Sequence, residues 1–350
     1  MPPSQPILVL PNLKKRFSGI TSTILQVLPE LEKECRMEIF GHALPGRARK
    51  PLTRRELFAL AAPGRPPVLF HARRNIDMVW GLLFRDLLRR NLRCLFTSVA
   101  QRPHTRFTRF LYGRMDRLLS TSERSASYLV RKPDAIIPHG TDIGRYLPAG
   151  DRQAAWRESG LPGKFGIGIF GRVRPNKGHR EFISALCEIL PRYPDFTAVV
   201  IGETTPKYQT FEGDLRARVA DHGLESRVCF LGSLPFGELP SWFRRLSLVA
   251  AVPHNEGFGL TCLEAMASGV PVVATRTGGF EMVIREGTDG RLIPCADTPA
   301  LVNALDSLLQ NPEALQEMGI HARRRIEEHF TAEREARRLL EQYRSLLHSH

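Results

Sequence analysis

The chain consists of short apolar runs that alternate with helical patterns, and this alternation limits its fold more than any other feature. The runs are dominated by Val, Ile, Leu and Phe and have no polar face, which is typical of strands buried on both sides. Parallel strands joined by covering helices are the arrangement that buries both faces of a sheet. The runs that predict strands are 6–10, 67–71, 93–99, 117–121, 135–139, 166–171, 196–202, 227–232, 248–252 and 270–275.

The strands form two successive series, separated by a stretch rich in Gly, Pro and polar residues. At 350 residues the chain is long enough for two cores of ordinary size. We therefore predict an α/β protein with two doubly wound, Rossmann-like parallel-sheet domains that face a central ligand cleft. The predicted division is a first domain at 1–150, a linker at 151–164, a second domain at 165–330 and a carboxyl-terminal helix at 331–350.

The net charge of +14 is confined to the first half of the chain. Residues 1–150 hold 26 Lys and Arg against 11 Asp and Glu, whereas residues 151–350 hold 24 against 25. This asymmetry indicates an anionic partner, although 42 of the 50 cations are Arg and an arginine-rich composition explains it equally well. Nucleic-acid binding is supported by charge alone, because no helix-turn-helix, zinc or RNP signature is present. We therefore predict that nucleic acid is not the partner.

The cysteine and hydropathy patterns indicate where such a chain works. The six cysteines are scattered without a C-x-x-C pair, which favours reduced thiols over disulfides or a zinc site. The amino-terminal apolar run precedes its charges and lacks a small-residue cleavage site, unlike a signal peptide. With no run of 18 apolar residues, a cytoplasmic protein is expected.

A glycine pattern in the second series resembles a dinucleotide fingerprint but lies in the wrong place. Gly166, Gly168 and Gly171 fit G-x-G-x-x-G, yet they lie within a strand, whereas the fingerprint follows its strand and opens a helix. No acid closes the next strand at the expected spacing of about 20 residues. The pattern therefore argues against a nicotinamide or flavin enzyme.

The loop after that strand, "GRVRPNKG" at 171–178, favours a diphosphate ligand. Gly171 ends the strand, Arg172 and Lys177 project from the loop, and Asn176 is expected to cap the next helix. Two cations beside a free helix N-terminus suit a diphosphate. The alternative is a basic loop without a ligand.

The stretch "HNEGFGLTCLEA" at 254–265 places two carboxylates across a loop-to-helix junction. Glu256 follows a strand, and the glycines after it let a ligand approach the backbone. Glu264 lies in a helix that Gly269 closes. Eight helical steps span about 12 Å, which exceeds the separation of roughly 5–9.5 Å in glycosidase carboxylate pairs. The two glutamates are therefore predicted to hold the ends of an extended, hydroxyl-bearing ligand, unless they are simply a loop acid and a solvated helix acid.

These motifs resemble the retaining glycosyltransferases of family 4, which have the GT-B fold. The glutamates resemble the family's E-x7-E motif, and the loop at 171–178 resembles its G-R-(x)n-K-G segment. Further similar segments are the strand–turn–strand at 269–294, the segment "IIPHGTDIGRY" at 136–146 and the glycine loop "SGITSTI" at 18–24. The usual Gly-Gly is here Ser18-Gly19, and His139 stands where the family commonly has Asn.

The resemblance implies a role for each matching residue. Glu264 would bind the ribose of a nucleotide sugar, and Glu256 would contact hydroxyls of the transferred sugar. Arg172 and Lys177 would bind the diphosphate and neutralise its charge on departure, and Gly19 would let the first domain close over the phosphates. Backbone N–H groups that would lie near the transferred sugar belong to Gly257, Phe258, Gly259 and Leu260. No metal or other cofactor is expected, since no D-x-D motif is present.

Two first-domain segments, 70–81 and 96–107, resemble the lipopolysaccharide-core mannosyltransferases of Gram-negative bacteria. The resemblance implies GDP-mannose as the donor and a Kdo-bearing lipid A acceptor. His71 and His104 are candidates beside the reacting groups, or else structural histidines. The candidate acceptor-binding residues, or else members of a solvated face, are Arg73, Arg74, Arg102 and Arg106.

Such an acceptor implies peripheral binding to the cytoplasmic face of the inner membrane. The stretch 75–93 is either a basic amphipathic helix on lipid or a helix that faces the core. Two functional alternatives stay open. One is a glycosyltransferase that uses a UDP-sugar on another envelope glycan, and the other is a non-catalytic nucleotide-sugar-binding protein.

Overall fold

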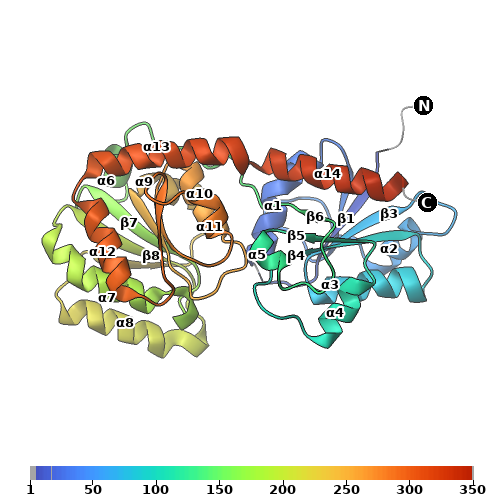
Figure 1. Cartoon of the computed structure of the whole chain (residues 1–350), viewed down its shortest axis with the longest axis horizontal. Coiled ribbons are helices and arrows are strands. Elements are labelled where there is room, and N and C mark those ends of the chain that lie inside the picture. The colour runs from blue at the N-terminus through green and yellow to red at the C-terminus, as the bar shows by residue number, and fades with distance from the viewer. Residues whose placement is uncertain (1–4, 17, 349–350) are drawn as a thin grey trace. The chain divides into compact units, whose positions relative to one another are not determined.

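The chain divides into two compact units in the computed structural model, which describes residues 5–16 and 18–348 (Figure 1). Unit 1 comprises Met1–Gly140 and Thr331–His350, and unit 2 comprises Thr141–Phe330. The predicted domain limits at residues 1 and 350 lie outside the described residues. Each unit is an α/β domain, which confirms the predicted fold class.

Unit 1 contains a six-stranded sheet in the order β2-β1-β3-β4-β5-β6, and every pair in it is parallel. The chain leaves β1 for β2 on one side and then places β3 on the other side, so the strand order reverses between β1 and β3. The strands are β1 (Ile7–Asn12), β2 (Arg36–Gly41), β3 (Val68–Ala72), β4 (Leu92–Ser98), β5 (Arg117–Ser120) and β6 (Ala135–Ile136).

Helices cover both faces of this sheet and create two separate cores. Leu8 and Leu10 of β1 face a core that includes Leu339 and Tyr343 from the carboxyl-terminal helix, while Val9 faces the opposite core. The helices are α1 (Gly19–Leu31), α2 (Arg54–Leu60), α3 (Asn75–Leu82) with the π-helical turn η1 (Leu83–Leu87), α4 (Arg106–Gly113), α5 (Glu123–Ala126) and α14 (Ala332–His348).

Unit 2 repeats this plan with the strand order β12-β11-β10-β7-β8-β9, again entirely parallel. Here the order reverses between β7 and β10. The strands are β7 (Phe165–Phe170), β8 (Phe196–Ile201), β9 (Val228–Gly232), β10 (Leu248–Ala251), β11 (Val272–Thr275) and β12 (Gly290–Ile293).

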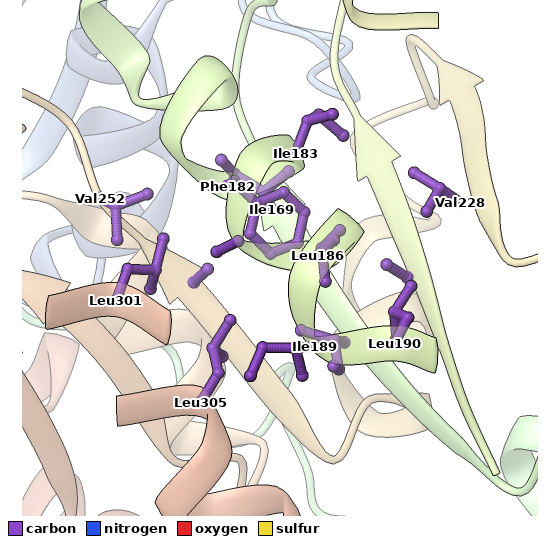
Figure 2. Close-up of a cluster of buried hydrophobic side chains, with 14 of the residues drawn as sticks. Ile169, Phe182, Ile183, Leu186, Ile189, Leu190, Val228, Val252, Leu301 and Leu305 are labelled. Atoms are coloured by element: carbon purple, nitrogen blue, oxygen red, sulfur yellow. The ribbon is translucent and has the colours of Figure 1, made fainter. Parts of the chain in front are cut away.

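The helices of unit 2 also bury both faces of their sheet. Figure 2 shows one of the two cores, where Phe182 and Leu186 of α7 and Leu301 and Leu305 of α12 gather around Ile169 of β7. The helices are α6 (Arg152–Arg157), η2 (Pro175–Lys177), α7 (His179–Ile189), η3 (Leu190–Arg192), η4 (Pro206–Tyr208), α8 (Gln209–Asp221), α9 (Leu239–Arg245), α10 (Leu260–Ala267), α11 (Phe280–Val283), α12 (Thr298–Leu309) and α13 (Pro312–His329).

The division of the chain differs from the predicted one at the start of the second unit and in the unit to which the terminal helix belongs, whereas the predicted end at residue 330 agrees with the structure. The segment predicted as a linker, 151–164, contains helix α6, whose Trp156 is fully buried in a core of unit 2. The terminal segment belongs to unit 1, because α14 packs on α1 and buries Leu339 and Tyr343 against that unit's sheet. The first unit is therefore made from two separate pieces of the chain.

Two local predictions also need correction. Asn176 lies within η2, and Gly178 occupies the N-cap of α7 with no side-chain cap bond. In the stretch 75–93, Met78 and Leu82 are buried in a unit 1 core, as the core-facing alternative requires, whereas Leu87 is 72% exposed. This segment is therefore not a helix lying on lipid along its length.

Candidate active site

The two loops that the sequence singles out in unit 2 follow neighbouring strands. β7 ends at Phe170, β10 ends at Ala251, and the two strands pair side by side. They are also the pair between which the strand order reverses. Ligands of open α/β sheets bind at the carboxyl strand ends at such a point. Both sequence motifs therefore lie at the place in the sheet where ligands of such folds bind.

The backbones of these two loops lie in close contact. Gly178 has a φ of 77°, and a Cβ there would lie 2.0 Å from the carbonyl oxygen of Val252, so no larger residue fits. The backbone N–H of His254 donates to the carbonyl of Asn176 at 3.1 Å. The ring Nε2 of His254 lies 3.0 Å from Glu181 Oε1. The loops therefore form one rigid edge.

Lys177 and Glu256 form an ion pair across this edge. Their side chains are only 21% and 25% exposed, so the pair is partly shielded from water. Glu256 Oε1 also accepts a hydrogen bond of 2.9 Å from the N–H of Gly257. Arg172 is half-buried on the same loop as Lys177. The structure thus brings together two of the residues predicted for the sugar and the diphosphate.

Glu264 lies on α10 in a more enclosed position, 6% exposed. The turn into this helix needs a glycine at position 259, where φ is 99° and a Cβ would lie 2.1 Å from the ring of Phe280. The hydroxyl of Tyr146, which is fully buried, donates to Glu264 Oε1 at 3.0 Å.

Tyr146 was not among the predicted site residues, because it precedes Glu264 by 118 positions and lies in no recognised strand. The remaining members of the loop lie as expected: the backbone of 257–260 leads into α10, and Phe258 is buried beneath it.

The strand reversal in unit 1 carries a second group of polar residues. Arg73 and Arg74 follow β3, and the N-terminus of α1 follows β1. Arg73 Nη1 donates to Thr23 Oγ1 at 2.9 Å, and Arg74 Nη2 donates to Ser18 Oγ at 2.7 Å. Within the described residues, neither guanidinium has a carboxylate within ion-pair distance.

The burial of this group makes it costly without a ligand. Arg73 is 7% exposed, and its Nε has no hydrogen-bond partner within the described chain. Burial lowers the pKa of Arg74 and raises the pKa of Asp77, which accepts from both arginine backbone N–H groups, to about 6. Buried cations next to a helix N-terminus suit an anion. Arg73 and Arg74 therefore fit their predicted role better than Arg102 and Arg106, which are exposed.

The two candidate histidines of unit 1, His71 and His104, differ in whether their ring nitrogens are already hydrogen-bonded within the core. His71 is 1% exposed, with Nδ1 2.7 Å from Tyr343 Oη and Nε2 2.7 Å from Thr97 Oγ1. Burial lowers its pKa well below 6.5, so it is neutral. Both ring nitrogens are occupied, so His71 is structural, and its prediction as a catalytic candidate is not supported.

His104 is half-buried, and its Nε2 lies 3.4 Å from Ser98 Oγ. Its pKa is lowered by burial first and then by Arg102 and Arg109. It remains a candidate beside an acceptor hydroxyl.

The His139-Gly140 pair closes unit 1. The carboxylate of Glu335, on α14, lies 2.9 Å from His139 Nδ1 and accepts from the N–H of Gly140 at 2.8 Å. A Cβ at Gly140 would lie 2.1 Å from the carbonyl oxygen of Thr331. The pair thus fixes the point where the chain leaves unit 1 and later returns. Gly19, by contrast, is the first residue of α1 and has open space where a Cβ would stand.

A cavity of about 190 Å³ lies at the opposite edge of the unit 2 sheet, next to Phe165 and Ser247, where β7 and β10 begin. The Arg152 guanidinium in its wall already donates to the carbonyls of Leu246 and Gly269. The cavity is therefore separate from the site.

Within 5–16 and 18–348, no three His, Cys, Asp or Glu side chains are grouped as metal ligands would be. No helix of that part of the chain is both long and apolar enough to cross a bilayer.

Comparison with known proteins identifies the family. The family model for "Glycosyl transferases group 1" matches residues 152–325. The chain is 40% identical to the lipopolysaccharide core biosynthesis mannosyltransferase LpcC of Rhizobium leguminosarum bv. viciae, over 97% of this chain and 96% of that protein. The chain belongs to the group 1 glycosyl transferases. It is therefore an enzyme that transfers a sugar, as the sequence predicted.

Solved structures agree with this assignment. The C-terminal domain of a group 1 glycosyl transferase (LpcC) from Francisella tularensis is 38% identical, with a TM-score of 0.53, and covers 54% of this chain and 97% of its own. HepE of Anabaena, solved with UDP and glucose, is 20% identical, with a TM-score of 0.81 over 97% of this chain and 99% of its own. The latter similarity shows the GT-B fold alone, and it confirms the predicted architecture.

Proposed function

We propose that this glycosyltransferase moves mannose from GDP-mannose, with retention of configuration, onto an anionic acceptor of the lipopolysaccharide-core type. The observation that carries the proposal is the Lys177–Glu256 ion pair at the strand reversal of unit 2. Both residues lie within the 97% of this chain that aligns with a core mannosyltransferase. The predicted roles of Glu264 at the ribose and of Arg172 at the diphosphate belong to the same proposal.

The ion pair supports a specific sequence of events. In the free enzyme Glu256 neutralises Lys177, so the cation is held in place before the donor arrives. A donor diphosphate would compete for the ammonium group and release the carboxylate to the hydroxyls of the transferred sugar. As the bond between sugar C1 and the phosphate oxygen breaks, Lys177 and Arg172 would stabilise the charge that develops on the leaving group.

The acceptor supplies the other half of the reaction. Its hydroxyl oxygen forms the new bond to C1, and its proton passes to the departing phosphate oxygen, so no side-chain base is required. Arg73 and Arg74 are proposed to bind a carboxylate or phosphate of the acceptor, because both are partly or wholly buried without an ion-pair partner among the described residues. Arg102 and Arg106 are proposed as weaker, exposed contacts.

A sugar-nucleotide panel tests the donor assignment. At about 100 times its Kd, GDP-mannose should stabilise the enzyme by about 2.7 kcal/mol, and UDP-glucose should not. Stabilisation by UDP-sugars alone would favour the alternative function, a glycosyltransferase that transfers sugar from a UDP-sugar to another envelope glycan. Binding without turnover of radiolabelled donor would identify a non-catalytic nucleotide-sugar-binding protein.

Metal independence and location are part of the same proposal. Activity should persist in excess EDTA, because two side-chain cations replace Mg²⁺ at the diphosphate. Abolition by EDTA and rescue by Mn²⁺ would contradict the proposed diphosphate site. The enzyme is proposed to work in the cytoplasm, bound peripherally to the inner membrane that holds its acceptor.

A further inference from the structure

The outward face of helix α4 carries two exposed phenylalanines. Phe107 and Phe110 are each 58% exposed, and a spacing of three residues places them on the same side of the helix. The opposite side of the helix is buried through Thr108, Leu111 and Tyr112. The two rings are therefore not needed to attach α4 to unit 1.

The neighbouring helix α3 also exposes an apolar side chain. Figure 1 shows α3 and α4 side by side in unit 1, and Asn75 Nδ2 donates to Thr108 Oγ1 at 2.8 Å between them. Ile76, the next residue of α3, is 41% exposed. We call Phe107 and Phe110, together with the exposed Arg106 and Arg109, the α4 face.

Positive charge predominates around the α4 face, where Arg114 pairs with the carboxylate of Asp86 at 3.3 Å. Residues 87–115 contain seven arginines and neither Asp nor Glu. The Arg114 guanidinium lies over the ring of Phe110, 5.6 Å from its centroid. Over the whole chain, unit 1 holds 29 Lys and Arg against 13 Asp and Glu, whereas unit 2 holds 21 against 23. The positive charge is therefore concentrated in the unit that exposes the phenylalanines.

We propose that the α4 face docks on an anionic phospholipid bilayer. Phe107 and Phe110 enter the boundary between headgroups and acyl chains, where aromatic rings are favoured. The arginines keep their guanidinium groups at the lipid phosphates while their apolar stems lie along the rings. The inference rests on the proposed membrane-borne acceptor and adds to it the surface that meets the membrane.

The charge distribution favours a bilayer over another protein as the partner. A bilayer with anionic lipids presents a continuous sheet of phosphates, and each arginine close to it strengthens binding about fivefold. A second copy of the chain would bring its own arginines against these, and like charges at an interface oppose association.

Flotation of the full chain with vesicles tests the proposal. Wild-type enzyme should float with vesicles of phosphatidylglycerol and phosphatidylethanolamine at low salt, and less at high salt. The double variant Phe107→Ser/Phe110→Ser should lose at least about tenfold in affinity, because two buried rings are removed. Ile320→Ser is the matched control, since Ile320 is 56% exposed on α13 of unit 2 and should float like the wild type.

A fluorescence measurement reports insertion directly. Tryptophan introduced by Phe110→Trp should be quenched by brominated lipids, whereas tryptophan introduced by Ile320→Trp should not. The quenching difference should be seen even if the serine double variant folds poorly.

The outcomes separate this inference from the proposed function. Transfer of mannose to a lipid-free acceptor fragment should be unchanged in the double variant. If the wild-type enzyme does not transfer mannose to the fragment, the proposed function is refuted. The flotation assay still tests the α4 face independently. Wild-type flotation by the double variant together with no quenching at position 110 would overturn the α4 face. Self-association of the wild type that the double variant abolishes, without vesicle binding, would also overturn it, in favour of a second copy.

Discussion

Single and double substitutions separate the proposed catalytic role of the Lys177–Glu256 ion pair from a role in stability alone. Glu256→Gln and Lys177→Gln should each lower kcat at least about tenfold, because Glu256 is proposed to hold the hydroxyls of the transferred sugar and Lys177 to stabilise the charge on the departing diphosphate. Each single variant should also lose stability, since it leaves its partner partly buried and unpaired. The combined variant should recover Tm but not kcat. Recovery of both, measured by steady-state kinetics and thermal unfolding, would show that the pair is only structural.

The hydrogen bond from Tyr146 fixes Glu264, which is proposed to hold the donor ribose. Tyr146→Phe should raise the donor KM about three- to tenfold and change kcat little, because it removes a single bond of about 1 kcal/mol from a carboxylate that holds the ribose. Tyr193→Phe is the matched control: Tyr193 Oη donates to Asp306 Oδ1 at 2.6 Å in the same unit, away from the site. Equal kinetic effects in the two variants would place Glu264 outside the donor site.

The site residues differ in how far the sequence could predict them. Glu256 and Lys177 each lie in a short motif directly after an apolar strand, so local patterns were sufficient to select them as candidates. Tyr146 ends the family-like segment at 136–146, but only the folded core shows that its hydroxyl reaches Glu264. The structural role of His71 could not be predicted either, because Tyr343, which hydrogen-bonds to its Nδ1, comes from the last helix of the chain.

The loops of the site depend on glycines that hold neighbouring backbones together. Gly178→Ala and Gly259→Ala should each destabilise unit 2 by more than 1 kcal/mol, because φ is positive at both sites and a methyl group would meet Val252 O or Phe280. Gly213→Ala, in the open middle of α8, should instead be neutral or stabilising by up to about 1 kcal/mol. Urea unfolding measures all three. Unchanged stability of Gly178→Ala would show that the two loops separate easily.

The strands were more predictable than the segments between them. All ten predicted apolar runs correspond to strands in the structure, because a strand buried on both faces needs no polar residues. β2 was missed, since its "RMEIFG" includes Glu38, a carboxylate that is buried only because Arg36 and Arg49 pair with it. Helix α6 was missed because its polar residues conceal the single buried anchor, Trp156.

At the scale of the whole molecule, unit 1 is discontinuous in sequence, because the chain enters unit 2 at Thr141 and returns to unit 1 at Thr331. A sequence pattern cannot reveal such a return, since the contacts that create it are long-range: Glu335 bonds to His139 across 196 positions. The correct limits of the second unit therefore have to be tested with fragments.

A fragment of residues 141–330 should fold alone, whereas one of residues 165–330 should be much less stable. The shorter fragment lacks Tyr146 and Trp156, both fully buried in a core of unit 2. The Trp156 ring fills the space above Gly166, where a Cβ would lie 2.3 Å from it. Removing one large buried aromatic costs about 3–5 kcal/mol, so losing both should take most of the stability of a domain this size. Near-ultraviolet circular dichroism and urea unfolding of the two fragments measure the difference. Equal stability would mean that residues 141–164, which include the predicted linker 151–164, contribute little to the folding of unit 2.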